Sequence, residues 1–497
     1  MLEIIGQIIL IVYGIAIVLI TLYCLMQFHL LYYYGRYKKG VKQNLLSQPD
    51  NSGEMPMVTV QLPIFNELHV SARLLESITQ LDYPKDRFEI HVLDDSTDET
   101  VELVAEEVKK YKAQGFQIEH VTRKIRTGYK AGALKDAMDQ AKGEFIAIFD
   151  ADFLPKPSFL RETIKQFNHP KVGVVQTRWT HLNQDYSLLT RVQAFQLNVH
   201  FTVEQLGRKA GNLLLQFNGT AGVWRKECIN DAGGWEADTL TEDLDLSYRA
   251  QLREWEIKYL EDTTSPAELP AEINGLKSQQ YRWMKGGAET AKKLIPTIWR
   301  SQLSPVKKLH ATTHLLGSSV FIAVFILGFI SVPLAFVLTP LGIATEKFAI
   351  FLVSLLSILI VYYVANVEVA WHKENKFKMI FKFVCIFPIF LSLSMGLSFH
   401  NSLAVIQGYL GKKTAFVRTP KFDITKVGDG FIQKKYFSRK IKASAIVEGL
   451  LFFYFMVGFG YGIWTGVHAF APMHFLLMIG YGLLFYYTLK SVSISRG

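Results

Sequence analysis

Two pairs of aspartates, each at the end of an apolar stretch, are the residues of this sequence best suited to chemistry. Asp94 and Asp95 close EIHVLDD, and Asp150 and Asp152 close FIAIFDAD. If both stretches are parallel strands, their carboxyl ends lie at one edge of a sheet, where ligands of such sheets bind. Carboxylates there, together with donor phosphates, can hold a hard divalent cation that offsets the charge growing on a diphosphate leaving group. The two pairs together predict a site for Mg²⁺ or Mn²⁺ and a diphosphate, whereas one Asp-x-Asp alone is weak evidence because loops after strands are often acidic.

A third acidic motif, TEDLDL, begins at Thr241. Its Asp243 is a candidate general base, a group that removes the proton of an attacking hydroxyl. In the structural interpretation, Thr241 caps a helix and the acids complement the helix dipole. Both interpretations can hold at once.

A basic motif, RTGYKAGAL, places Arg126 and Lys130 around a predicted helix start. Such a start can bind phosphate through side-chain cations and free backbone amides. The alternative is a solvated basic turn.

Two aromatic motifs could contact a sugar. Gln279, Arg282 and Trp283 form Q-x-x-R-W, in which Arg can hold a pyrophosphate and Trp offers a flat face. Gly219 and Gly222 in FNGTAGVWR would let the backbone approach a sugar chain. The structural alternative for Q-x-x-R-W is that Trp283 only anchors the helix at the membrane interface. The structural alternative for FNGTAGVWR is a tight turn.

The elements that must position these residues alternate between Met57 and about Leu260. VTVQLPIF, EIHVLDD, QIEHVTR, FIAIFDAD and VGVVQTRW are typical of buried strands, and amphipathic stretches separate them. This alternation predicts an α/β domain with a mostly parallel sheet. The first strand is not followed by G-x-G-x-x-G, which disfavours a dinucleotide-binding fold.

The rest of the chain is typical of membrane helices. Apolar residues make up 49% and aromatic residues 13% of the composition, which is high for a soluble protein. The run from Ile4 to about Tyr34 precedes basic residues and is expected to be an uncleaved anchor with its end in the cytoplasm. Met379–Leu410 has basic residues on both flanks, so it is expected to be interfacial or re-entrant. Four other apolar runs are expected to cross: about Leu309–Leu338, Phe348–Val369, Ala443–Trp464 and Met473–Leu489.

Charge and cysteine content narrow the class of protein. The net charge of +10 comes largely from basic residues beside apolar runs, and no nucleic-acid motif is present, so no nucleic-acid partner is expected. Three cysteines without metal-ligand spacing argue against a disulfide framework.

The expected organisation is a transmembrane helix at 1–40, a linker at 41–56, an α/β domain at 57–300, two transmembrane helices at 301–376, an interfacial or re-entrant part with a loop at 377–442, and two transmembrane helices at 443–497.

In order, DDS, DAD, TED and QxxRW resemble the signature of processive family-2 glycosyltransferases, and the strings VLDDSTD, GYKAGAL, IFDADF, QFNGTAGVWR and QQYRW resemble the cellulose-synthase-like A and C proteins. This resemblance covers about Met57–Gly287. It implies a GT-A-like domain on an α-helical membrane bundle. The implied activity is inverting transfer of a hexose from GDP-mannose or UDP-glucose to a growing β-linked polysaccharide, with export of the product through the bundle.

The resemblance also implies roles for single residues. Asp243 would be the base, and Asp150 and Asp152 would bind the cation. The nucleotide-sugar residues would be Pro63, Glu67, Asp94, Asp95, Lys130, Asp150, Gln279, Arg282 and Trp283. The acceptor residues would be Gly219, Thr220, Glu242 and Trp283. Phe416, Arg418, Thr419 and Lys421 resemble, more loosely, a gating loop that closes over the donor.

Two other functions fit parts of the pattern. A lipid glycosyltransferase that adds one sugar to ceramide or diacylglycerol would share the aspartate motifs. A non-catalytic nucleotide-sugar sensor or transporter would not need every acid that is present. We expect a multi-pass membrane protein with a cytoplasmic catalytic domain, in a bacterial cytoplasmic membrane rather than a Golgi membrane.

Overall fold

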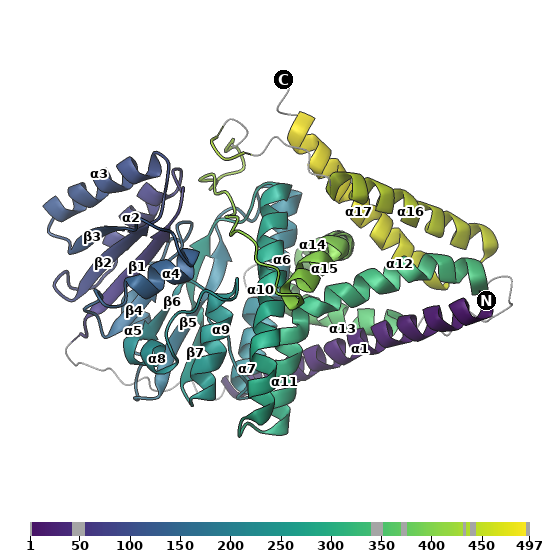
Figure 1. Ribbon diagram of the computed structural model, residues 1–497, viewed down its shortest axis with the longest axis horizontal. Helices are drawn as coiled ribbons and strands as arrows, with labels where there is room; N and C mark the ends of the chain where they lie inside the picture. Colours follow the sequence, from purple (N-terminus) through teal and green to yellow (C-terminus); the bar gives the residue numbers. More distant parts are fainter. Residues whose placement is uncertain are drawn as a thin grey trace.

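The computed structural model describes residues 2–41, 55–338, 351–368, 375–430, 434–437 and 444–493. A sheet with flanking helices forms one side of the molecule, and long helices form the other (Figure 1). Helix α10, Ile273–Arg300, lies between the two parts. Most of the predicted linker at 41–56, and parts of the loop before residue 443, lie outside the described residues.

The seven-stranded sheet has the order β3-β2-β1-β4-β6-β5-β7. Its strands are β1 Val58–Ile64, β2 Phe88–Asp94, β3 Ile118–Thr122, β4 Phe145–Ile148, β5 Val172–His181, β6 Gly222–Arg225 and β7 Glu256–Ala267. The first five are the five predicted strands, and the predicted mostly parallel α/β class is confirmed. Only β6 pairs antiparallel, with β4 and β5. The strand register places Gln61 opposite Ile148 and Ile64 opposite Asp94, so both aspartate pairs follow strands at one edge, as predicted.

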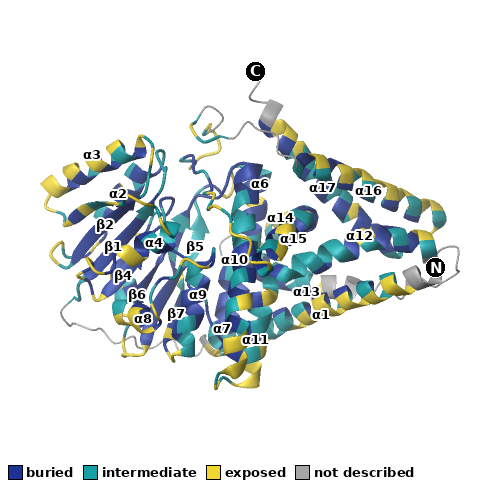
Figure 2. Cartoon of the chain, in the orientation of Figure 1, coloured by how far each residue is buried: buried dark blue, intermediate teal, exposed yellow. Residues whose placement is uncertain are grey.

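Helices cover both faces of the sheet and continue into the interface. They are α2 Ser71–Thr79, α3 Thr100–Ala113, α4 Tyr129–Asp136, α5 Phe159–Ile164, α6 Leu188–Val199, η1 His200–Glu204, α7 Gln205–Ala210, α8 Lys226–Asp231 and α9 Glu242–Leu252. The strands pack apolar side chains on both faces: in β4, Phe145 and Ala147 belong to one buried apolar cluster and Ile146 and Ile148 to another, and the sheet is largely buried (Figure 2). This two-sided burial explains the near-continuous apolar strand sequences.

The second part consists of long apolar helices. They are α1 Leu2–Val41, α11 Pro305–Leu315, η2 Leu316–Ser319, α12 Val320–Leu338, α13 Phe351–Tyr363, η4 Val364–Glu368, α14 Lys376–Gly396, α15 Ser398–Tyr409, α16 Ser444–Thr465, η5 His468–Phe470 and α17 Ala471–Ser493. Exposed apolar side chains line the outer face of α1, such as Ile11 and Ile15, as expected for contact with lipid (Figure 2).

Five helices among the described residues are long and apolar enough to cross a membrane, which fits a multi-pass membrane protein. They are Gln7–Gly40, Pro305–Val337, Lys376–Gly396, Ser444–Thr465 and His468–Ser491. The set differs from the predicted one: it includes α14, and the described apolar part of α13 is the shorter Leu356–Glu368. Length and composition do not fix which helices cross, so the interfacial position of Met379–Leu410 stays a prediction.

Candidate active site

A cavity of about 620 Å³ begins at the edge of the sheet where the aspartates lie and continues between the membrane helices. Asp95 and Asp150 line its sheet end, and Tyr362 of α13 and Phe390 of α14 line its membrane end. The predicted residues that line it are Pro63, Glu67, Asp95, Lys130, Asp150, Asp152, Gly219, Glu242, Asp243, Gln279, Arg282, Trp283, Phe416, Arg418, Thr419 and Lys421. Asp94 and Thr220 do not line it. Segments more than 300 residues apart in the chain therefore meet in one place.

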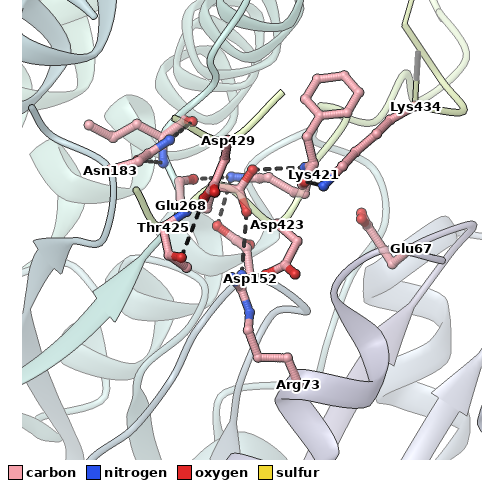
Figure 3. Close-up of polar contacts among 12 residues, drawn as sticks. Glu67, Arg73, Asp152, Asn183, Glu268, Lys421, Asp423, Thr425, Asp429 and Lys434 are labelled. Carbon is pink, nitrogen blue, oxygen red and sulfur yellow. Dashed lines mark hydrogen bonds and ion pairs between the residues drawn. The ribbon is translucent and has the colours of Figure 1, made fainter. Parts of the chain in front are cut away.

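The two aspartates of the Asp-x-Asp motif each form an ion pair with a lysine. Lys130 Nζ lies 2.5 Å from Asp150 Oδ1, and Lys421 Nζ lies 2.7 Å from Asp152 Oδ2. The Lys421 ammonium also donates to the carbonyl of Glu268 (Figure 3). The carboxylate pair thus attracts positive charge from two separate segments of the chain.

This donor set fits a divalent cation. Asp150 and Asp152 present hard carboxylate oxygens, the ligands that Mg²⁺ and Mn²⁺ prefer, and a cation there would replace the attraction now supplied by the lysines. A second acidic cluster, Glu236, Asp238 and Asp245, shares Lys293, whose Nζ lies 2.6–3.0 Å from all three, but none of its members lines the cavity, whereas Asp150 and Asp152 do. The predicted pair is therefore the better candidate metal site.

The DDS aspartates have different surroundings. Asp95 accepts two hydrogen bonds from the Arg123 guanidinium, at 2.9 Å and 2.5 Å, and borders the cavity. The Asp94 side chain is fully buried, accepts from Ser96 N at 2.9 Å and contacts His120 Nε2 at 2.9 Å. Its oxygens are thus occupied by protein groups, and Asp94 is better described as a support for the turn after β2 than as a nucleotide ligand.

Gly219 and Thr220 have unequal positions as well. Gly219 has φ of +81°, and a Cβ there would come 3.1 Å from Asp243 Oδ2 and 3.6 Å from Lys130 Nζ. Its carbonyl accepts from Lys130 at 2.9 Å. Thr220 is buried, and its Oγ1 accepts from Asp150 N at 2.9 Å. A glycine is therefore needed where the base and the lysine approach each other, while Thr220 holds the backbone of Asp150 behind the cavity.

Asp243 and Glu242 form the first turn of α9. Thr241 makes no side-chain cap and instead pairs with Thr290 Oγ1 at 3.1 Å, so the predicted capping role is wrong. Burial, and then the adjacent Glu242 carboxylate, raises the pKa of Asp243 to about 7. Burial also raises the pKa of Glu242. A carboxyl group with this pKa can exchange a proton near neutral pH, as a general base requires.

The pKa of Asp243 predicts a pH dependence. Only the ionised carboxylate of Asp243 accepts a proton. We therefore expect little transfer at a pH below the pKa of Asp243 and full transfer at a pH above it. We expect kcat/KM to rise about tenfold per pH unit up to about pH 7 and then to level off. Initial rates with subsaturating donor in a series of buffers test this, and a flat profile across the acid side would contradict the role of Asp243.

Helix α10 presents the Q-x-x-R-W residues to the cavity. Its first turn is capped by the Glu272 carboxylate, which accepts from Asn274 N and Gly275 N. Nearby carboxylates of Asp150 and Glu242 favour the charged form of Arg282, although burial lowers its pKa to about 10. Arg282 therefore remains a cation close to the acids, where a diphosphate could use it.

The Phe416–Lys421 segment lies directly across the cavity. Arg282 donates to the carbonyl of Val417 and, at 3.0 Å, to Thr419 Oγ1. Arg418 Nη1 lies 3.0 Å from Glu67 Oε2, and burial raises the pKa of Glu67 to about 8 despite this arginine. Every predicted residue of this segment is thus in contact with the site, while closure over a donor stays a prediction.

Sequence reasoning missed two residues at the same edge. His181 ends β5 and Glu268 follows β7, and both strands run parallel to β4. Glu268 accepts from Phe422 N at 2.8 Å and lies 3.3 Å from Arg73 (Figure 3). Burial lowers the pKa of His181 to about 3, so its imidazole is neutral. The strand-end rule that found the aspartates also points to His181, just after the predicted strand VGVVQTRW, and would have found Glu268 had β7 been recognised.

Comparison with known proteins identifies the α/β domain. Residues 56–286 match the family model described as "Glycosyltransferase like family 2". This stretch of the chain is similar to that family. Probable glucomannan 4-beta-mannosyltransferase 7 of Oryza sativa subsp. japonica is 44% identical over 264 residues, which are 52% of this chain and 45% of that protein. Glucomannan 4-beta-mannosyltransferase 2 of Arabidopsis thaliana is 43% identical over 256 residues, 50% of this chain and 48% of that protein.

The chain spans about half the length of the curated relatives it matches. A solved structure, the mannosyltransferase PcManGT from Pyrobaculum calidifontis in complex with GDP-Man and Mn²⁺, covers 81% of this chain and 100% of its own with a TM-score of 0.50. At 19% identity this likeness concerns the fold alone. It supports a GT-A-like fold for the glycosyltransferase domain.

Proposed function

We propose that this protein is a membrane-integrated inverting glycosyltransferase that moves a hexose from GDP-mannose or UDP-glucose to a growing β-linked polysaccharide. The observation that carries the proposal is the cavity itself. It joins the Asp-x-Asp carboxylates, the buried Asp243 and Arg282 in one space, and it continues between the membrane helices. The names of the plant relatives make GDP-mannose the first donor to test.

The donor would bind at the sheet edge. Lys130 and Arg282 offer cations for the diphosphate, and Pro63, Glu67 and Asp95 border the same space for the nucleotide. Asp150 and Asp152 would hold Mg²⁺ or Mn²⁺, which when bound neutralises charge on the diphosphate and makes it a better leaving group. Lys421 would then be free to leave Asp152 and to contact a phosphate oxygen instead.

The transfer itself would be a direct displacement. Asp243 takes the proton of the acceptor hydroxyl while the hydroxyl oxygen attacks the anomeric carbon, and the bond from that carbon to the diphosphate oxygen breaks. The new bond forms on the opposite face of the sugar, so the configuration inverts. The close approach of Lys130 and Asp243 at Gly219 supports this proposal, since Asp243 would then act beside the group that would hold the leaving phosphate.

A polymer acceptor fits the geometry better than a lipid that is glycosylated once. The cavity extends past Trp283 to aromatic residues of the membrane helices, Tyr362 and Phe390. A path with aromatic side chains along its wall can hold several sugars through many weak contacts that act together. Export of the chain through the helices is part of this proposal.

Trp283→Ala should shorten the polymer. With limiting enzyme and excess donor, the wild type is expected to give long chains while most acceptors stay unextended. Loss of one stacking face should cost about 1 kcal/mol of acceptor binding, and hence several-fold in chain length. Size analysis of labelled product measures this. Trp299→Ala is the control, because Trp299 is on the same helix but is 53% exposed and contacts Thr312 instead. Unchanged chain length in Trp283→Ala would contradict a stacking role.

The cellular location and the domain limits belong to the same proposal. The catalytic domain, residues 57–300, would face the cytoplasm, with the predicted membrane parts on either side of it in the sequence. The matched relatives are plant proteins, so they do not favour the expected bacterial membrane over a Golgi membrane.

A further inference from the structure

A buried ion pair joins helix α10 to the C-terminal helices. Lys277 Nζ lies 2.5 Å from Glu448 Oε1 of α16 and donates to Thr488 Oγ1 of α17 at 2.8 Å. Thr488 Oγ1 also donates to Glu448 Oε2 at 3.2 Å. The side chains of Lys277 and Glu448 are 3% and 5% exposed. Glu448 near the start of α16 and Thr488 near the end of α17 place this triad at one end of the two-helix hairpin.

Stability alone does not account for such a pair. Removing two charges from water is costly, and apolar side chains of similar volume often stabilise a protein as well or better. Ionisable residues within membrane segments are correspondingly rare and commonly serve function. The triad is therefore expected to fix a particular arrangement of helices, here that of α10 against the hairpin.

The position of Lys277 on α10 shows what that arrangement controls. At about 100° per residue, Gln279, Arg282 and Trp283 lie on the face of α10 opposite Lys277. These three residues line the cavity, so the hairpin holds one face of the helix while the other face forms the site. Rotation of α10 about its axis would move Arg282 and Trp283 directly.

A second helix, α15, also holds α10. A Cβ on Gly408 would meet the Lys285 carbonyl at 2.7 Å, so the two backbones pack closely there. Tyr281 OH also donates to Gln407 Oε1 at 2.5 Å. Both contacts lie C-terminal to Lys277, and His400 Nε2 of α15 lies 2.9 Å from the Lys277 carbonyl. The ion pair adds to these a link from the Lys277 side chain to the hairpin, within the first two turns of α10.

We propose that the Lys277–Glu448 pair is a positioning device that sets the angle at which α10 presents Arg282 and Trp283. The C-terminal hairpin is thereby part of the catalytic machinery and not only an anchor. The effect on turnover rests on the proposed glycosyl transfer, whereas the effect on α10 itself does not.

The test replaces the pair by apolar residues of similar size, Lys277→Met with Glu448→Leu, which leaves no unpaired charge. In purified protein we expect kcat to fall at least about tenfold with donor KM changed much less, because a small displacement of positioning groups costs rate more than ground-state binding. The reversed pair, Lys277→Glu with Glu448→Lys, should recover part of the loss. Hydrogen exchange of the Gln279–Trp283 backbone is followed in the same samples and should become faster in the apolar variant.

The control removes another buried polar contact of α17. Ser331 Oγ lies 2.7 Å from His474 Nε2, and neither residue touches α10. Ser331→Ala with His474→Phe should leave kcat and exchange of α10 unchanged.

A folded apolar variant with wild-type kcat and exchange would overturn the proposal. If the apolar variant does not fold, the test uses Glu448→Gln, which keeps an oxygen for Lys277 but removes the charge. A lower kcat in this variant would support the positioning role of the ion pair, and a wild-type kcat would contradict it. Faster exchange in the apolar variant, together with a wild type that transfers no sugar, would support the positioning role of the pair and refute the proposed function.

Discussion

Asp243→Asn should retain donor binding and lose glycosyl transfer by about a hundredfold to ten-thousandfold, the usual contribution of general base catalysis. The amide keeps the shape of the side chain but cannot accept a proton at neutral pH. Burial and the neighbouring Glu242 raise the pKa of Asp243 to about 7, so the wild-type carboxylate is poised for this step. Single-turnover transfer and equilibrium binding of the donor, measured on the same preparation, separate the two effects.

Asp238→Asn is the matched control. Asp238 lies five residues earlier, is exposed and does not line the cavity. It should transfer sugar at the wild-type rate. Near-normal turnover by a folded Asp243→Asn variant would refute the assignment of the base and leave the donor site untouched.

Asp152→Asn and treatment with chelator should each lower activity by about two orders of magnitude or more, since a bound cation stabilises transition-state charge by several kcal/mol. Asp150→Ala and Asp152→Ala should be at least as severe. Added Mg²⁺ or Mn²⁺ should restore the chelated wild type but not the variants. Rates measured across a metal titration show which cation serves best.

The second acidic cluster supplies the control for the metal. Glu236→Gln alters a cluster that does not line the cavity, so the metal dependence of this variant should match that of the wild type. Full activity of the wild type in excess chelator would rule out the metal-dependent mechanism.

The sequence predicted the sheet and its reactive edge well because burial on both faces leaves a strong apolar signal. It missed β7, whose residues EIKYLEDTTSPA are largely polar and only partly buried. With β7 unknown, Glu268 could not be assigned to the edge, and His181 was missed although it follows the predicted strand VGVVQTRW. Asp94 shows a second limit of the sequence. The sequence alone does not distinguish an aspartate whose carboxylate is bound by Ser96 and His120 from one that is available to a ligand.

Contacts between distant segments were beyond sequence reasoning. The pairing of Lys421 with Asp152 spans 269 residues, and that of Lys277 with Glu448 spans 171. Neither has a periodic pattern, because each depends on how the helices and the loop fold back on the domain. The resemblance placed Lys421 near a donor, but its pairing with the metal-site aspartate required the structure.

The most direct test of the account is the product formed from a labelled donor. Purified protein in lipid is given labelled GDP-mannose or UDP-glucose with Mg²⁺ or Mn²⁺, and the product is divided into solvent-extractable and polymeric fractions. The account predicts label in a long polymer that an endo-acting β-mannanase or β-glucanase degrades, with none formed by Asp243→Asn. Label found only in a solvent-extractable glycolipid, in proportion to added lipid, would contradict polymer synthesis.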